Sequence, residues 1–271
     1  MGLALPSWRA GANRQAIVDF LRSVTVGPDA VPAAERLATF DNDGTLACEK
    51  PRTALAAFLM QESLGALGDV GGGHEVLHEL GALMAGRTTS DYEQRSRAFL
   101  DEARHPRFGR GYPVLVYAPM RELIDLLHAL EFSVFLCSDS SRDFNRVLAG
   151  PAYGLRRERV IGSEVQIELR GAQLVRTAVP VPLDDGPGKV VHIWDRTGQQ
   201  PLLAAGNAAG DIEMLTAARF ALLIHHDDPE REYAYDDPRA LSAAARRGWS
   251  VISMREDFAT LWVSETIGTT L

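Results

Sequence analysis

Two carboxylates lie one residue apart in the chain, at Asp41 and Asp43, separated by Asn42 and followed by Gly44. The apolar run Leu37–Phe40 ahead of them predicts a buried strand that ends in a polar turn. Because alternate side chains of an extended segment share a face, we expect the two aspartates to point to one spot and Asn42 to point elsewhere. Two like charges this close are tolerated when a divalent cation lies between them, or when one carboxyl is protonated and the other is an anionic nucleophile.

Acidic pairs followed by glycine are also ordinary turn chemistry, so this segment taken alone leaves a structural role as open as a catalytic one. A calcium loop of the EF-hand kind is disfavoured by spacing. Gly44 is the fourth residue counted from Asp41, whereas such a loop has oxygen ligands at every second position through the fifth before its glycine.

Strand-like apolar runs alternate with helical patterns along the rest of the chain, and this alternation predicts an α/β fold with a doubly wound parallel sheet. Expected helices cover residues 13–24, 119–130, 142–148 and 189–194, and an expected hairpin covers 165–169 and 173–177. Expected strands at 37–40, 133–137, 202–205 and 221–224 each end in polar residues, at Asp41, Ser138, Asn207 and His225. Parallel strands would gather these residues at the carboxyl edge of the sheet, where such folds bind ligands.

The interval between the first two strands contains helical patterns and no clear strand. Helices are expected over 53–67, over 74–84, and from a capping box at Ser90 and Glu93 to about His105. This composition predicts a helical insertion of residues 47–112 in a core of residues 1–46 and 113–271. A group of arginines in and after the third helix is interpreted as a solvated face in preference to a substrate-facing patch: Arg95, Arg97, Arg104, Arg107 and Arg110.

Composition excludes several classes of protein. At 271 residues and 46% hydrophobic, the chain can bury a full core. A net charge of −8 argues against a nucleic-acid-binding surface. No apolar run approaches the roughly 18 residues of a membrane span, and no signal peptide is visible, so a cytoplasmic location is expected. Cys48 and Cys137 are expected to be reduced thiols. Cysteine catalysis is not expected, because nothing near Cys48 in the sequence forms a set of cysteine, histidine and acid.

The polar groups at the predicted strand ends suit phosphoryl transfer. Besides the aspartate pair they comprise a hydroxyl at Ser138, a lysine that opens a helix at Lys189, and the glycine-flanked segment 206–211. A phosphomonoester carries two negative charges, so an anionic nucleophile such as Asp41 can attack it only if a cation and a lysine offset that charge.

With these motifs the chain resembles the haloacid dehalogenase (HAD) superfamily, and within it the phosphoserine-phosphatase-like phosphatases. The four family motifs match, in order, residues 41–45, Ser138, Lys189 and 206–211. The resemblance implies that Asp41 forms an aspartyl-phosphate and that Asp43 protonates the leaving alcohol and then activates water. It also implies that the insertion 47–112 is a helical cap domain.

The resemblance further implies two sets of ligand-binding residues. Phosphate and substrate would contact Ser138, Asp139, Lys189 and Gly210, and Mg²⁺ would be held by Asp41, Asp43, Asn207 and Asp211. The sequence departs from the family twice. Asn207 stands where the fourth motif usually has aspartate, and Asp139 stands where the second motif usually has glycine.

The expected function is therefore a Mg²⁺-dependent phosphatase acting on a small phosphorylated metabolite, since dehalogenases of the superfamily lack the second aspartate. A phosphomutase or phosphotransferase is the alternative within the superfamily, and a non-catalytic phosphometabolite-binding protein is the alternative suggested by Asn207 and Asp139. Glu49 and Lys50 are candidates for leaving-group recognition. The pair His225–His226 is more typical of a loop at a strand end than of a second metal site.

Overall fold

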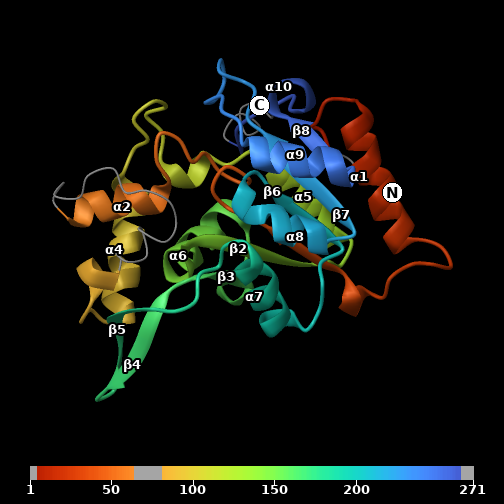
Figure 1. Ribbon diagram of the computed structural model, residues 1–271. Coiled ribbons are helices and arrows are strands. Elements are labelled where there is room, and N and C mark those ends of the chain that lie inside the picture. Colours follow the sequence, from red (N-terminus) through yellow and green to blue (C-terminus); the bar gives the residue numbers. More distant parts are fainter. Residues whose placement is uncertain (1–4, 64–80, 264–271) are drawn as a thin grey trace.

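The computed structural model describes residues 5–63 and 81–263 (Figure 1). Its centre is a six-stranded parallel sheet of order β3-β2-β1-β6-β7-β8, which confirms the predicted doubly wound architecture. The strands are β1 (Leu37–Phe40), β2 (Ser133–Ser141), β3 (Val160–Ser163), β6 (Leu203–Gly206), β7 (Phe220–His225) and β8 (Ser250–Ser253).

Helices cover both faces of this sheet. Alternate residues of β1 illustrate the division, because Ala38 packs into one buried apolar cluster and Leu37 into the other. The first cluster includes residues of α1 (Ala12–Thr25), α5 (Ala118–Ala129), α6 (Arg142–Tyr153) and α10 (Met254–Asp257). The second includes residues of α7 (Pro187–Thr197), α8 (Ile212–Ala217) and α9 (Pro238–Arg247). Single turns of 3₁₀ helix occur at η1 (Ala33–Glu35), η2 (Tyr112–Val114), η3 (Arg157–Arg159) and η4 (Ala209–Asp211).

The helical insertion packs beside α6 (Figure 1) through α2 (Ala54–Glu62) and α4 (Thr89–Glu102). The rings of Phe58 and Phe99 lie 5.5 and 6.2 Å from the ring of Phe144 on α6. The expected helix over 53–67 is confirmed to Glu62. It ends there, with Ser63 as its C-cap. Residues 64–67 of the expected range, and residues 74–80 of the expected helix over 74–84, lie outside the described residues.

The start of α4 differs from the prediction. The expected capping box at Ser90 is wrong, because Thr88 is the N-cap and its Oγ1 accepts a hydrogen bond from the Asp91 amide at 3.1 Å. The helix ends at Glu102, three residues before the expected His105, because Ala103 adopts an extended conformation.

The predicted hairpin is confirmed as β4 (Val165–Arg170) and β5 (Gln173–Pro180), which project from the sheet (Figure 1). The backbone of Arg176 in β5 exchanges two hydrogen bonds with the insertion: the Gly86 amide donates to its carbonyl and its amide donates to the Arg87 carbonyl, both at 2.9 Å. The hairpin therefore contacts the helical insertion although its residues belong to the range assigned to the core.

No helix in the described ranges 5–63 and 81–263 combines the length and apolarity that a membrane crossing needs. Cys48 and Cys137 are both free and buried, as expected for reduced thiols.

Candidate active site

The turn after β1 presents the two aspartates to the carboxyl edge of the sheet. Asp41 still pairs in strand fashion, because its amide donates to the Ala205 carbonyl at 3.0 Å. The turn is then closed by a hydrogen bond from the Leu46 amide to the Asn42 carbonyl at 2.9 Å. Asn42 Oδ1 accepts from the Tyr153 hydroxyl at 2.6 Å, and its side chain is also hydrogen-bonded to Asp43. The expectation that Asn42 points elsewhere than the two aspartates therefore stays a prediction.

Gly44 allows this turn to approach the turn after β6. Its φ is +78°, and a Cβ at this position would lie 2.1 Å from Nδ2 of Asn207, so a larger residue would displace that side chain. The approach places the Thr45 hydroxyl 3.3 Å from Asp41 Oδ2 and 3.1 Å from Asn207 Oδ1. One oxygen of Asp41 and the amide oxygen of Asn207 thus flank the same hydroxyl.

Lys189, in the first turn of α7, joins the first and fourth motifs. Its buried Nζ donates to Asp41 Oδ1 at 2.7 Å and to Asp211 Oδ1 at 2.6 Å. Asp211 Oδ2 accepts from the amides of Asn207 and Ala208 at 2.9 and 3.1 Å. Both oxygens of Asp211 therefore accept hydrogen bonds from the protein.

A serine that the sequence reasoning missed holds the second aspartate. The Ser140 hydroxyl donates to Asp43 Oδ2 at 2.7 Å, while the predicted residue Ser138 accepts from the Ser140 amide at 3.2 Å. The sequence was expected to turn at 138–141, but β2 continues to Ser141. In an extended strand Ser138 and Ser140 share a face, so the period of two could have identified Ser140.

The carboxylates of the site carry more negative charge than Lys189 can offset. Burial, followed by the charge of Asp211, raises the pKa of Asp41 well above its usual value, against the opposing effect of Lys189. Burial, followed by the charge of Asp139, raises the pKa of Asp43 to about 7. Burial also raises the pKa of Asp139 to about 6. Asp139 therefore acts on the site, and the group as a whole favours binding of a cation.

The donor atoms at this edge suit a hard divalent cation. Asp41 Oδ2 and Asn207 Oδ1 are oxygen ligands of the kind that Mg²⁺ prefers. Within residues 5–63 and 81–263, side chains of His, Cys, Asp and Glu alone do not form a group of three that could hold a metal ion. An ion here would accordingly need amide or main-chain oxygens in addition to carboxylates.

The two other predicted site residues lie at the margin of this group. Gly210 allows close approach of the turn before α7: its carbonyl accepts from the Gly186 amide at 2.9 Å, and a Cβ would lie 2.1 Å from Asp185 Oδ1. Glu49 Oε1 lies 3.5 Å from Asn207 Nδ2 and 3.7 Å from Nζ of Lys50.

His225 and His226 bind different partners, so they do not converge on one ion. His225 Nε2 lies 2.7 Å from Asp236 Oδ1. His226 Nε2 lies 2.7 Å from the Gly44 carbonyl, and its Nδ1 lies 3.1 Å from Glu232 Oε2. His226 thus supports the turn after β1, through a contact that spans 182 residues of sequence and has no local signal.

Cys48 does have a histidine and an acid beside it, contrary to the expectation from sequence. Its Sγ donates to Glu232 Oε1 at 3.0 Å and lies 3.8 Å from His105 Nε2. Burial and the Glu232 carboxylate raise the pKa of this thiol, so it stays protonated and is a poor nucleophile.

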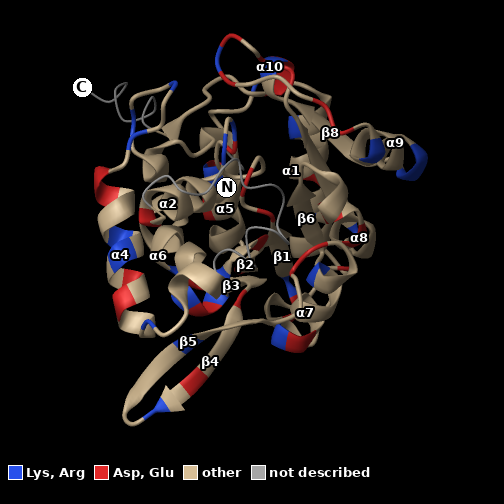
Figure 2. Ribbon diagram, turned by 60° about the vertical axis from the view of Figure 1, so that its left-hand side comes forward, with Lys and Arg blue, Asp and Glu red and all other residues tan. Residues whose placement is uncertain are grey.

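The arginines of α4 pair with acids on the insertion itself, which agrees with a solvated face. Arg95 binds Glu62 and Arg97 binds Glu93, each at 3.0 Å. Figure 2 shows acidic and basic residues side by side along α4. Arg107 instead reaches the core, where it donates to the Glu232 carbonyl at 2.7 Å.

No protein-family model and no curated protein matches the sequence. Solved structures do match the fold. A conserved functionally unknown protein from Anaerococcus prevotii DSM 20548 has a TM-score of 0.67 at 12% identity, over 96% of this chain and 98% of that one. A protein of unknown function from Bordetella pertussis Tohama I has a TM-score of 0.54 at 17% identity, over 80% and 98%. Cytosolic 5′-nucleotidase IIIB bound to cytidine has a TM-score of 0.51 at 12% identity, over 93% and 89%.

Proposed function

Since the chain has the fold of the haloacid dehalogenase superfamily, we propose that it is a phosphatase that hydrolyses a small phosphomonoester with Mg²⁺ and with Asp41 as nucleophile. The observation that carries this proposal is the bridge of Lys189 Nζ between Asp41 and Asp211, at 2.7 and 2.6 Å, beside the second aspartate held by Ser140. This arrangement fixes Oδ1 of Asp41, while Oδ2 lies 3.3 Å from the Thr45 hydroxyl, which is also 3.1 Å from Asn207 Oδ1.

The proposed reaction has two steps. In the first, a carboxylate oxygen of Asp41 forms a bond to phosphorus while the bond from phosphorus to the ester oxygen breaks, and Asp43 gives its proton to the leaving alkoxide. In the second, Asp43 takes a proton from water, the water oxygen attacks phosphorus, and inorganic phosphate leaves as Asp41 is regenerated. A pKa of about 7 suits Asp43 to both roles, because it is partly protonated near neutral pH.

Mg²⁺ would be held by Asp41, the Asp43 carbonyl and Asn207, and it would offset the negative charge of the phosphoryl group during transfer. Ser138, Lys189 and the turn at Gly210 would hold phosphate oxygens. Asp211 would keep Lys189 charged, because its carboxylate and that of Asp41 hold the pKa of the lysine well above its usual value despite burial.

The proposed substrate class is a small phosphorylated metabolite in the cytoplasm. We assign residues 47–112 as the cap that limits substrate size, with the hairpin β4–β5 attached to it through Arg176. Glu49 and Lys50 would contact the leaving group, since Glu49 lies beside Asn207.

A panel of phosphomonoesters assayed for phosphate release with and without Mg²⁺ tests this function. We expect release from at least one member, dependent on Mg²⁺ and blocked by EDTA. Label that passes from substrate to an added alcohol would instead indicate a phosphotransferase or phosphomutase. Tight ligand binding without any release would indicate the binding protein and overturn the proposal.

Two substitutions in the fourth motif should change Mg²⁺ dependence in opposite directions. Asn207→Asp adds a charged oxygen donor, so we expect half-maximal activity at about three- to tenfold less Mg²⁺. Asp211→Asn removes the charge that holds Lys189, so we expect turnover to fall by about ten- to a hundredfold and half-maximal activity to need more Mg²⁺. Activity titrated against Mg²⁺ measures both. Unchanged Mg²⁺ dependence in both variants would show that this turn is not part of the metal site.

Loss of the Ser140 hydroxyl should move the pH profile. The hydrogen bond from Ser140 lowers the pKa of Asp43, so Ser140→Ala should raise that pKa further. If protonated Asp43 is the acid of the limiting step, activity is lost as pH rises through its pKa, and this basic limb should move up by about one unit. Rate measured from pH 5 to 9 is the test, with Ser242→Ala on the exposed face of α9 as control. A downward shift would contradict the acid role.

A further inference from the structure

A cavity of about 450 Å³ lies between α4, α6, η3 and the hairpin β4–β5, and Asp41 and Asp43 do not line it. This volume is within the range of sites for small molecules. Three arginines line it, namely Arg142, Arg146 and Arg157, and Ile167 and Leu174 of the hairpin form an apolar side. Asp41, Asp43 and Lys189 are not among its described lining residues.

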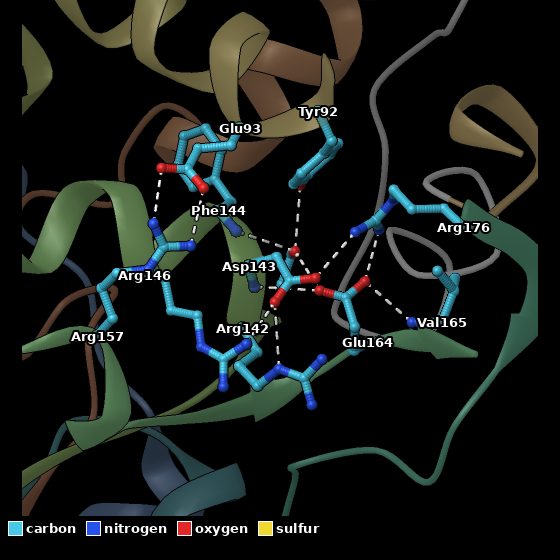
Figure 3. Close-up of polar contacts among 11 residues, drawn as sticks. Tyr92, Glu93, Arg142, Asp143, Phe144, Arg146, Arg157, Glu164, Val165 and Arg176 are labelled. Carbon is cyan, nitrogen blue, oxygen red and sulfur yellow. Dashed lines mark hydrogen bonds and ion pairs between the residues drawn. The ribbon is translucent and has the colours of Figure 1, made fainter. Parts of the chain in front are cut away.

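Asp143 cannot neutralise the arginines that surround it (Figure 3). Its Oδ1 accepts from Arg146 Nη1 at 2.9 Å and from Arg142 Nε at 3.3 Å. Its Oδ2 accepts from Arg176 Nη1 at 3.1 Å. Glu164 neutralises part of this charge, since Arg176 Nη2 donates to it at 2.5 Å. Three guanidinium groups therefore meet two carboxylates, and one positive charge is left over on the side of the cavity.

Guanidinium nitrogens without a described protein partner remain there. Arg146 Nε is buried and has no hydrogen-bond partner among the described residues. Arg142 donates to a described residue through Nε only, and in Figure 3 its terminal nitrogens point away from Asp143. Burial, followed by the charge of Arg142, lowers the pKa of Arg146, which shows that the two like charges are close.

Arg157 lies at the edge of the cavity and is paired with an acidic residue. Its guanidinium is held by Glu93 of α4 through hydrogen bonds of 2.7 and 2.8 Å, and its side chain is 60% exposed. Both Arg157 and Glu93 line the cavity, and their opposite charges cancel. The pair therefore leaves the excess positive charge of Arg142 and Arg146 unchanged.

We propose that this cavity binds a multiply charged oxyanion of a small molecule, either a phosphate group or clustered carboxylates, with Arg142 and Arg146 as its donors. Planar guanidinium forks match the oxygens of both groups. An apolar part of the same ligand would contact Ile167 and Leu174. The site does not depend on the proposed phosphatase activity, because it uses none of the residues of that reaction.

Arginine footprinting tests the site without interference from phosphate bound at Lys189. Phenylglyoxal modifies accessible arginines, and mass spectrometry measures the modification of each one. We expect inorganic phosphate to slow modification of Arg142 and Arg146 in a saturable manner and to leave exposed Arg246 of α9 unaffected. Citrate, which carries clustered carboxylates, is tested in a parallel series. Protection by phosphate alone or by citrate alone identifies which of the two kinds of oxyanion the cavity binds. Equal effects on all three arginines, or none with either anion, would overturn the proposal.

Variants separate binding from folding. Arg142→Gln should raise the phosphate concentration that half-protects Arg146 by at least about tenfold, whereas Arg142→Lys should raise it less because the charge remains. Arg246→Gln is the matched control and should leave it unchanged. Unfolding temperatures show whether each variant is folded. Protection of Arg146 that is the same in folded Arg142→Gln as in the parent would also overturn the proposal.

Discussion

Replacing Asp41 by asparagine is expected to lower turnover by at least about a thousandfold while the protein stays folded. An amide cannot form the acyl-phosphate bond that the proposed mechanism needs. Folding should survive, because burial already raises the pKa of Asp41 and the neutral side chain removes a buried charge. Lys189 keeps Asp211 as its partner at 2.6 Å.

The measurement is steady-state phosphate release, with thermal unfolding followed on the same sample. Asp195→Asn is the matched control, since it makes the same chemical change on the exposed face of α7. Near-normal turnover in a folded Asp41→Asn protein would withdraw the nucleophile assignment. Loss of activity together with loss of the cooperative unfolding transition would show only that the variant is unfolded. The nucleophile assignment then requires a folded Asp41→Asn protein that still binds phosphate.

Asp43→Asn is expected to slow alkyl phosphates by about a hundred- to ten-thousandfold and aryl phosphates much less. A phenolate leaves without help, whereas an alkoxide needs the proton that Asp43 supplies. The ratio of the two rates is the informative quantity, because a general loss of metal or phosphate binding would reduce both equally. An equal fall for both classes would show that Asp43 is not the acid.

Asp139→Asn is the control for this experiment. After burial, the charge of Asp139 is the largest cause that raises the pKa of Asp43, and the proposed mechanism gives Asp139 no part in proton transfer to the leaving group. Its loss should lower the pKa of Asp43 and move the basic limb of the pH profile down. The ratio of alkyl to aryl rates below that limb should stay at the parent value, in contrast to the ratio in Asp43→Asn.

Local chemistry made much of the site predictable. β1 has the bounds that its apolar run indicated, and the aspartate pair follows it directly in a turn at the carboxyl edge of the sheet. Lys189, which was expected at a helix start, lies in the first turn of α7 and contacts Asp41 of the first motif. These features depend on turns, caps and periodicity over a few residues, which a sequence shows directly.

Short edge strands were missed for the opposite reason. β3 and β8 have four residues each and lie at the two edges of the sheet. Their segments include Gly162 or flanking serines, so neither forms a strong apolar run. Edge strands gain their pairing from one neighbour that is distant in sequence, and local propensity contributes little to their formation.

The sequence by itself therefore determined the alternating architecture and the residue types at the carboxyl edge. Only the tertiary structure decided which groups support them: Ser140 on Asp43, His226 on the Gly44 carbonyl, and Glu232 beside Cys48. The arginine cavity has the same origin, because Arg142 and Arg176 come from elements 34 positions apart and meet at one carboxylate. Such contacts form when helices and hairpins pack, and buried polar groups then pair with whichever donors the packing brings within reach.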